Sequence, residues 1–212
     1  MSFRHRAIPL FVAALLPGVA VAQDVDYAAL YDRGVPFARF LERAESHRAE
    51  WLGNFERATP DDDALARVRA LPERQRVLVV AEDWCTDSLN TVPYLAKLVD
   101  AVPERLELRV IDSTVGKPVM EANRTADGRS ATPTIVVLGA DSRPPGSWVE
   151  RPAVLQKWFT EQKPLVPREE LLERKAKWYA EDAGKSTVAE IVMLLERAAH
   201  AVKADALAQA GR

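Results

Sequence analysis

Apolar residues recur along the chain with two different periods, which divide it into helical and strand-like segments. Residues 27–57 and 64–71 have the three- and four-residue spacing of helices. A break with an N-cap signal at residues 59–63 separates them, and Pro72 ends the second. The first segment is expected to turn an apolar face toward a core: Phe37, Phe40, Leu41, Ala44, Trp51, Leu52 and Phe55.

The middle of the chain alternates predicted strands with predicted helices. In order, these are a strand at residues 77–81, a helix at 89–99, a strand at 106–111, a helix at 117–125, and strands at 134–138 and 147–150. Pro93 lies inside the first of these helices and should kink it, because proline removes a backbone donor and crowds the preceding turn.

The C-terminal part is predicted to be helical, at residues 152–159, 165–179 and 186–207. Thr187 and Glu190 have the spacing of a capping box at the start of the last helix. The same helix carries an apolar stripe that we expect to pack on the core, rather than in a partner's groove: Val188, Ile191, Val192 and Leu195. Together the elements predict an α/β domain with helical extensions at both ends.

The first 22 residues have the features of a cleaved secretory signal peptide. A basic start precedes an apolar run at residues 7–16, and Ala20-Val21-Ala22 forms a cleavage pattern ahead of Gln23. The run is short for a membrane span, so an uncleaved anchor is the less favoured interpretation. We therefore expect cleavage after Ala22, a periplasmic or otherwise secreted protein, and no stable membrane insertion afterwards.

Composition narrows the possible partners. The 212 residues suffice for one sizeable domain with extensions, and the formal net charge is -2. Removal of residues 1–22 takes away Arg4 and Arg6 and moves the charge to about -4. No cluster of Lys and Arg indicates a nucleic-acid surface, so nucleic acid is not an expected partner.

Cys85 is the only cysteine of the chain, so an internal disulfide cannot form. It lies between a predicted strand and a predicted helix, in the stretch EDWCTDS at residues 82–88. Helix-terminal amides and the helix dipole favour a thiolate at such a position. Free cysteines are more often buried and inert, but the polar residues that follow favour a reactive thiol here.

An ordered set of features in this region resembles the thioredoxin superfamily. Trp84-Cys85 ends a strand, Pro93 is the eighth residue after the cysteine, and Thr132-Pro133 precedes a strand at the spacing of a cis-proline loop. The stretches EDWCTDS and WVERP (residues 148–152) are similar to bacterial thioredoxin-like proteins with a W-C-x-D motif, which commonly lack the second cysteine.

The resemblance implies a thioredoxin-like fold, in which helices flank a central mixed sheet. Residues 75–163 would form this core, residues 23–74 an N-terminal helical extension, and residues 164–212 a C-terminal helical extension. It also implies a cis peptide bond before Pro133, with the backbone of Thr132 left free to pair with an extended peptide.

The chain departs from dithiol thioredoxins at two positions. Ser88 stands where their second cysteine would be, and Val79 where they carry a buried acid. Cys85 could still attack a disulfide to form a mixed disulfide, but an external thiol would have to resolve it. The expected partners are therefore thiols and disulfides of proteins or of glutathione.

The expected catalytic residues are Cys85 as nucleophile, with Ser88 and Asp87 beside it. Asp87 is either a general acid/base or, more simply, a helix-capping acid. Its charge would oppose a thiolate, and those of Glu82 and Asp83 would add to this if they point the same way. The helix terminus and nearby hydroxyl groups would favour the thiolate.

The expected substrate-binding residues are Trp84, Thr86, Thr132 and Pro133. We expect Trp84 to shield the sulfur and pack on the sheet, with contact to substrate as the alternative. Two residues of the WVERP stretch could line the same cleft, but a packed tryptophan at position 148 and a surface arginine at position 151 are the simpler expectation.

Three functions remain open at this stage. The leading hypothesis is an exported monothiol thiol–disulfide oxidoreductase, and the second is a non-redox module that binds peptides or proteins. A glutathione-assisted iron–sulfur carrier fits the export signal and the motif poorly. No cofactor is expected, and one cysteine with His47 and His200 on distant predicted helices makes a protein-only metal site improbable.

Overall fold

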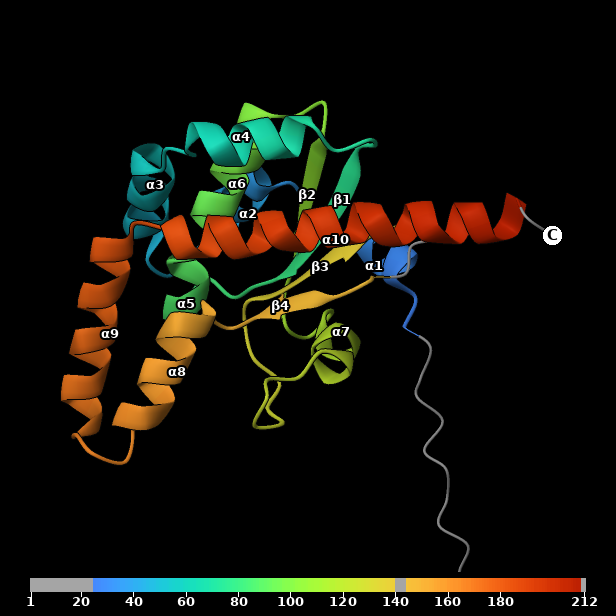
Figure 1. The fold of residues 1–212 in the computed structure, drawn as a ribbon. Coiled ribbons are helices and arrows are strands. Elements are labelled where there is room, and N and C mark those ends of the chain that lie inside the picture. Colours follow the sequence, from blue (N-terminus) through green and yellow to red (C-terminus); the bar gives the residue numbers. More distant parts are fainter. Residues whose placement is uncertain (1–24, 140–143, 211–212) are drawn as a thin grey trace, which may run out of the picture.

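The computed structural model describes residues 25–139 and 144–210, with side chains described up to residue 201 (Figure 1). The predicted signal peptide and its cleavage site lie outside the described residues. No helix of the described part is both long and apolar enough to cross a membrane.

A mixed four-stranded sheet forms the centre of the molecule, in the order β2-β1-β3-β4. β1 (Gln75–Val80) runs parallel to β2 (Leu106–Ile111) and antiparallel to β3 (Thr134–Leu138), which in turn pairs antiparallel with β4 (Ser147–Val149). The predicted α/β class with a central mixed sheet is confirmed. The register places Val80 opposite Thr134, so the end of β1 meets the start of β3 at one end of the sheet.

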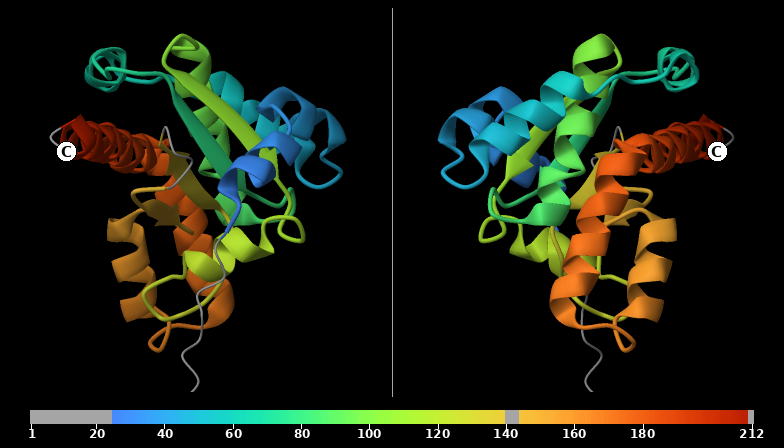
Figure 2. Two further views of the ribbon diagram at one scale, coloured as in Figure 1. Left: turned by 90° about the vertical axis from the view of Figure 1, so that its right-hand side faces the viewer. Right: turned by 90° about the vertical axis from the view of Figure 1, so that its left-hand side faces the viewer.

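The two faces of the sheet pack against different helices, as the two turned views show (Figure 2). One face is covered by α2 (Phe37–Arg43), α3 (Arg48–Arg57), α4 (Asp62–Arg69), α6 (Val92–Ala101) and α10 (Lys185–Ala210). The other is covered by α1 (Tyr27–Arg33) and α7 (Lys117–Ala122).

The apolar run of β1 is continuous because both of its faces are covered. Val77 and Val79 contribute to one cluster, and Leu78 and Val80 to the other. All four side chains are fully buried. This strand therefore anchors the segment that follows it, which carries Cys85.

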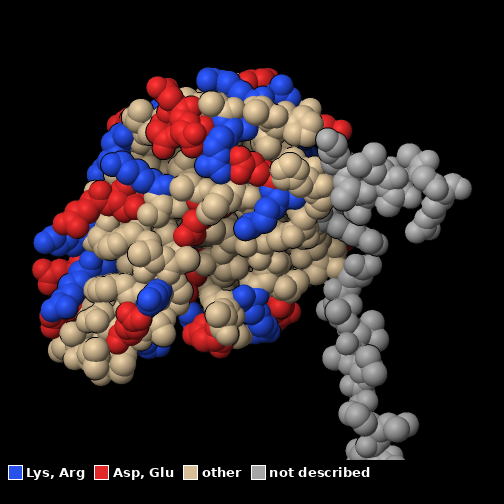
Figure 3. Space-filling model, viewed as in Figure 1, with Lys and Arg blue, Asp and Glu red and all other residues tan. Residues whose placement is uncertain are grey.

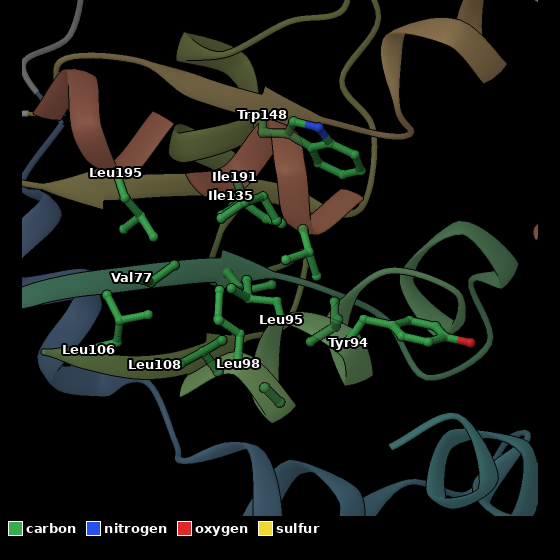
Figure 4. Packing of buried hydrophobic residues seen from close by; sticks show 14 of the residues in the cluster. Val77, Tyr94, Leu95, Leu98, Leu106, Leu108, Ile135, Trp148, Ile191 and Leu195 are labelled. Atoms are coloured by element: carbon green, nitrogen blue, oxygen red, sulfur yellow. The ribbon is translucent and has the colours of Figure 1, made fainter. Parts of the chain in front are cut away.

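Helix α10 packs across the sheet, as predicted from its apolar stripe. Ile191 and Leu195 are fully buried and lie over β1 and β3 near Val77 and Ile135 (Figure 4). Between β4 and α10 the chain forms a helical hairpin of α8 (Ala153–Gln162) and α9 (Arg168–Asp182), which extends from one end of the sheet beside α5 (Thr86–Leu89) (Figure 1).

The helical pattern predicted over residues 27–57 forms three helices rather than one, because the chain breaks twice there. Val35 forms an isolated bridge to Val110, which ends α1 and requires a close approach of Gly34 to Arg109. A Cβ on Gly34 would lie 2.8 Å from Arg109 Cβ. His47 adopts a left-handed conformation (φ 54°) immediately before α3 and separates it from α2.

Two predictions about helix starts are also wrong. Pro93 does not kink a helix, because α6 begins at Val92 and places the proline in its first turn, where the missing N–H costs nothing. Thr187 and Glu190 do not form a capping box. The Glu190 carboxylate instead accepts hydrogen bonds from Trp148 Nε1 at 2.6 Å and from Ala153 N at 2.8 Å, tying α10 to β4 and α8.

Candidate functional site

Cys85 occupies the N-cap position of α5, directly after the loop that leaves β1. Its sulfur accepts a hydrogen bond from Ser88 N at 3.5 Å, and its S–H group points to the carbonyl oxygen of Thr132 at 3.3 Å. The side chain is half-buried. α5 has only four residues, so the helix dipole expected from the sequence is small. The helix therefore stabilises a thiolate mainly through the one hydrogen bond from Ser88 N–H.

The cis-proline loop lies against the sulfur because of the strand register. Thr132-Pro133 has a cis peptide bond and directly precedes β3, whose first residue pairs with the last residue of β1. Glu150 N donates to Pro133 O at 2.8 Å, and Thr134 Oγ1 donates to Ala131 O at 2.7 Å. These bonds hold the loop from both sides.

The two acids before the cysteine are held by neighbouring loops. Asp83 Oδ2 accepts hydrogen bonds from Glu45 N at 2.7 Å and Ser46 N at 2.9 Å. Glu82 Oε1 accepts one from Ser113 N at 2.7 Å. These carboxylates therefore satisfy backbone donors and fix the loop that presents the cysteine.

Trp84 is not packed on the sheet, contrary to the prediction. It is 61% exposed, whereas Trp148 is buried in the core and donates to Glu190. The sequence pattern could not separate the two tryptophans, because Trp84 stands in a loop with no periodicity. Its exposure leaves a large aromatic surface on the residue directly before Cys85.

Asp87 is buried inside an ionic cluster, which neither sequence-based interpretation anticipated. Its Oδ1 accepts hydrogen bonds from Tyr179 Oη at 2.8 Å and Lys175 Nζ at 3.0 Å. Its Oδ2 accepts one from Arg151 Nη2 at 3.0 Å. The predicted surface position of Arg151 is wrong: the residue is 6% exposed, because this carboxylate and Glu150 pair with it.

The cluster continues as a line of alternating charges to the turn at residues 125–129. Arg151 Nη2 contacts Glu150 Oε1 at 2.7 Å, and Arg129 donates to both Glu150 oxygens at 3.0 and 2.8 Å. Arg129 also donates to Asp127 at 2.7 Å. From α9 to this turn the order is Lys175, Asp87, Arg151, Glu150, Arg129, Asp127.

Charge and burial shift the pKa values of groups in this line. Burial, followed by the Asp87 charge, raises the pKa of Tyr179 well above its usual value, so the phenol stays neutral and donates. At the solvent end, hydrogen bonds from Arg129 and Thr125 lower the pKa of Asp127 to about 2. The guanidinium of Arg151 lies 4.2 Å from the ring centre of Phe159 in α8, a cation–π contact.

Ser88 and Thr86 take up different positions from those expected of hydroxyl neighbours of the thiol. The Ser88 side chain is fully buried and its hydroxyl has no hydrogen-bond partner, so only its backbone N–H meets the sulfur. The Thr86 hydroxyl accepts a hydrogen bond from Lys175 Nζ at 3.1 Å.

Sequence reasoning missed Lys175 and Tyr179, which lie 88 and 92 residues from Asp87. One signal was present. Leu171, Lys175 and Tyr179 recur every four residues on a helix that is otherwise mostly charged, and they form its buried stripe. In the part with described side chains, no group of three or more His, Cys, Asp or Glu residues is arranged to hold a metal ion.

Comparisons with known proteins agree with this architecture. A family model described as Thioredoxin matches residues 34–163. The crystal structure of a protein of unknown function from Pseudomonas aeruginosa has a TM-score of 0.66 and 22% identity, and the match covers 81% of this chain and 98% of that chain. An HIV epitope scaffold has a TM-score of 0.64 and 20% identity, with the same coverage. No curated protein matches the chain.

Proposed function

Because the chain belongs to the thioredoxin family, we propose that it performs thiol–disulfide exchange through Cys85 as a monothiol protein, with an external thiol completing the reaction. The observation that carries the proposal is the position of the sulfur. It is half-buried at a helix N-cap and lies 3.3 Å from the carbonyl of the residue before a cis-proline.

The proposed reaction has two exchanges. The Cys85 thiolate attacks one sulfur of a disulfide; a new S–S bond forms to Cys85, the old one breaks, and the other sulfur leaves as a thiolate. Since the chain has no second cysteine, glutathione or a protein thiol then attacks the mixed disulfide and releases Cys85. No net oxidant is needed, because each step exchanges one disulfide for another.

The surroundings of the sulfur suit a disulfide carried by a polypeptide. Trp84, the residue directly before Cys85, offers an exposed apolar surface through its indole. On the face seen in Figure 3, acidic and basic side chains are interspersed rather than gathered by sign, so this face carries no patch for a strongly charged partner. The predicted signal peptide supports an exported site of action, in the periplasm or beyond.

A non-redox binding module is the second candidate function. It is favoured by the absence of a second cysteine and by the contact of the thiol with Thr132, which leaves the resting S–H group with a partner. In this case the loop at Thr132-Pro133 would bind a peptide, and Cys85 would be a packed side chain without chemistry.

Trapping the mixed disulfide separates the two functions. The purified protein is incubated with oxidised glutathione at neutral pH, and the mass increase at Cys85 is followed over time. The urea-unfolded chain provides the reference rate for the same thiol, and Cys85→Ser provides the blank. Glutathionylation faster than in the unfolded chain, reversed by reduced glutathione, supports exchange. A folded-state rate at or below the unfolded reference would leave only the binding module.

A further inference from the structure

Helix α9 docks on the rest of the protein through a single stripe, and most of that stripe is polar. Its buried residues are Leu171, Lys175 and Tyr179, spaced four apart. Lys175 and Tyr179 both donate a hydrogen bond to the same atom, Asp87 Oδ1, at 3.0 Å and 2.8 Å respectively. The α8–α9 hairpin is therefore attached to the side chain that lies two residues after Cys85.

Lys175 contacts both residues that directly follow the cysteine. The residue is 5% exposed, and its ammonium group donates to Thr86 Oγ1 at 3.1 Å as well as to Asp87. A buried lysine is costly unless it is paired, so these two contacts determine where its charge lies. One long side chain thus immobilises the first turn of α5, whose N-cap is Cys85.

The charge balance of the cluster depends on this lysine. Three cations and three carboxylates alternate along it, and Lys175 is the terminal cation at the end nearest Cys85. Arg151 is shared between Asp87 and Glu150, so it does not neutralise Asp87 alone. Without Lys175 the cluster would carry one excess negative charge next to the place where a thiolate must form.

We propose that Lys175 is a positioning residue for Cys85: its buried ammonium group holds Thr86 and Asp87 in place and offsets the Asp87 charge, so that the neighbouring sulfur can become negative. The inference rests on the proposed chemistry at Cys85. In this arrangement the positive charge that compensates Asp87 comes from the α8–α9 hairpin and not from the EDWCTDS stretch.

The other groups that face Asp87 do not replace Lys175 in this role. Arg151 reaches it from the end of β4, and Tyr179 from α9. Tyr179 is a neutral donor because burial and the Asp87 charge raise its pKa well above the usual value. Glu150 adds a negative charge one contact further away, through Arg151. Among the residues whose side chains are described, Lys175 is thus the cation on Asp87 that no second carboxylate shares.

The pH profile of Cys85 alkylation tests the role of Lys175. Iodoacetamide modification is measured from pH 5 to 10 in the parent protein and in Lys175→Met, which keeps the apolar stem and removes the charge. We expect the midpoint of the profile to rise by roughly one pH unit and the rate at pH 7 to fall roughly tenfold. Lys177→Met, on the exposed face of the same helix, is the matched control and should leave the profile unchanged.

A second substitution makes the test independent of packing. Asp87→Asn leaves Lys175 as an uncompensated cation, so the midpoint should move down, and the double variant should return toward the parent. Loosened packing would move both single variants in the same direction. An unchanged or lowered midpoint in Lys175→Met, or shifts of equal sign in the two variants, would overturn the proposal.

A measurement on the unaltered protein covers the case in which neither variant folds. The NMR signal of the Lys175 ammonium group is followed across the same pH range, and it should show an inflection where Cys85 ionises. A signal without that inflection would refute the coupling.

Failure of this inference is distinguishable from failure of the proposed function. Alkylation reports the ionisation of the thiol, and glutathionylation reports exchange. Opposite shifts of the alkylation profile without any mixed disulfide would refute the exchange function alone. Rapid mixed-disulfide formation with an unchanged profile in Lys175→Met would refute the role of Lys175 alone.

Discussion

The sulfur of Cys85 lies 3.3 Å from the carbonyl oxygen of Thr132, a residue 47 positions away in the sequence. As a thiol, Cys85 donates to this oxygen. As a thiolate it would lose that bond and be repelled by the carbonyl, which leaves Ser88 N–H as its donor. Ionisation should therefore turn the sulfur away from the cis-proline loop and toward the start of α5, which opens the loop backbone to an incoming chain.

The first prediction concerns Cys85 as a helix cap. Cys85→Ser should be more stable than Cys85→Ala by about 1 kcal/mol, because a serine hydroxyl can accept the Ser88 N–H hydrogen bond and alanine cannot. Urea unfolding of the two variants at pH 7 measures this difference. Equal stabilities would mean that the 3.5 Å contact to sulfur does not cap α5.

The second prediction concerns Trp84 as a contact for substrate. Trp84→Ala should change the free energy of unfolding by less than about 0.5 kcal/mol, since the side chain is 61% exposed. If the indole covers an apolar part of a protein substrate, loss of about 1 kcal/mol of contact slows exchange with a protein disulfide roughly fivefold. Exchange with oxidised glutathione serves as the control reaction. Equal slowing of both reactions would argue against a role in recognising polypeptides.

The third prediction concerns Tyr179 and alkaline pH. Its folded-state pKa is raised well above the value of 10.0 expected in the unfolded chain. The stability that it contributes is therefore fully present below pH 10 and is lost as the pH rises further, because the unfolded chain then releases a proton that the folded protein retains. Tyr179→Phe should lose less stability than the parent between pH 9 and pH 11.

The same substitution removes the hydrogen bond to Asp87 and should cost about 1–2 kcal/mol at pH 7. Urea unfolding across the pH range measures both effects. Tyr31 and Tyr94, whose pKa values are also raised by burial, are present in both proteins and cancel in the comparison. An equally steep alkaline loss in the variant would exclude Tyr179 as its source.

The fourth prediction concerns the turn between α9 and α10. Gly184 has a φ of +78°, and a Cβ there would lie 2.2 Å from the ring of Tyr94. Gly184→Ala should therefore destabilise the protein by about 3 kcal/mol or more, from backbone strain and overpacking together. Gly128→Ala is the matched control, because its φ is +81° but nothing lies within 4 Å of the added atom. It should cost about 1 kcal/mol, and similar losses in both variants would rule out the clash with Tyr94.

Local sequence patterns determined the sheet and the position of Cys85 directly after its first strand. The strands at 106–111 and 134–138 were predicted with the bounds that the structure has, because alternation and burial of apolar residues are properties of each segment by itself. The place of Cys85 between strand and helix followed from the local pattern, and the cis peptide before Pro133 was implied by the resemblance to the thioredoxin superfamily.

Only the tertiary structure decided the surroundings of Cys85. Asp87 has the sequence context of a capping acid, and Arg151 that of a surface residue. Asp87 is buried because Lys175 and Tyr179 reach it from a hairpin more than 80 residues further along the chain. Arg151 is buried because the carboxylates of Asp87 and Glu150 pair with it. Whether a charged side chain is buried depends on the partner that compensates its charge, and a linear pattern does not contain that partner. The exposure of Trp84 was also decided by the tertiary structure, for a different reason. Periodicity shows which face of a helix or strand is apolar, but not which loop residues the rest of the fold leaves uncovered.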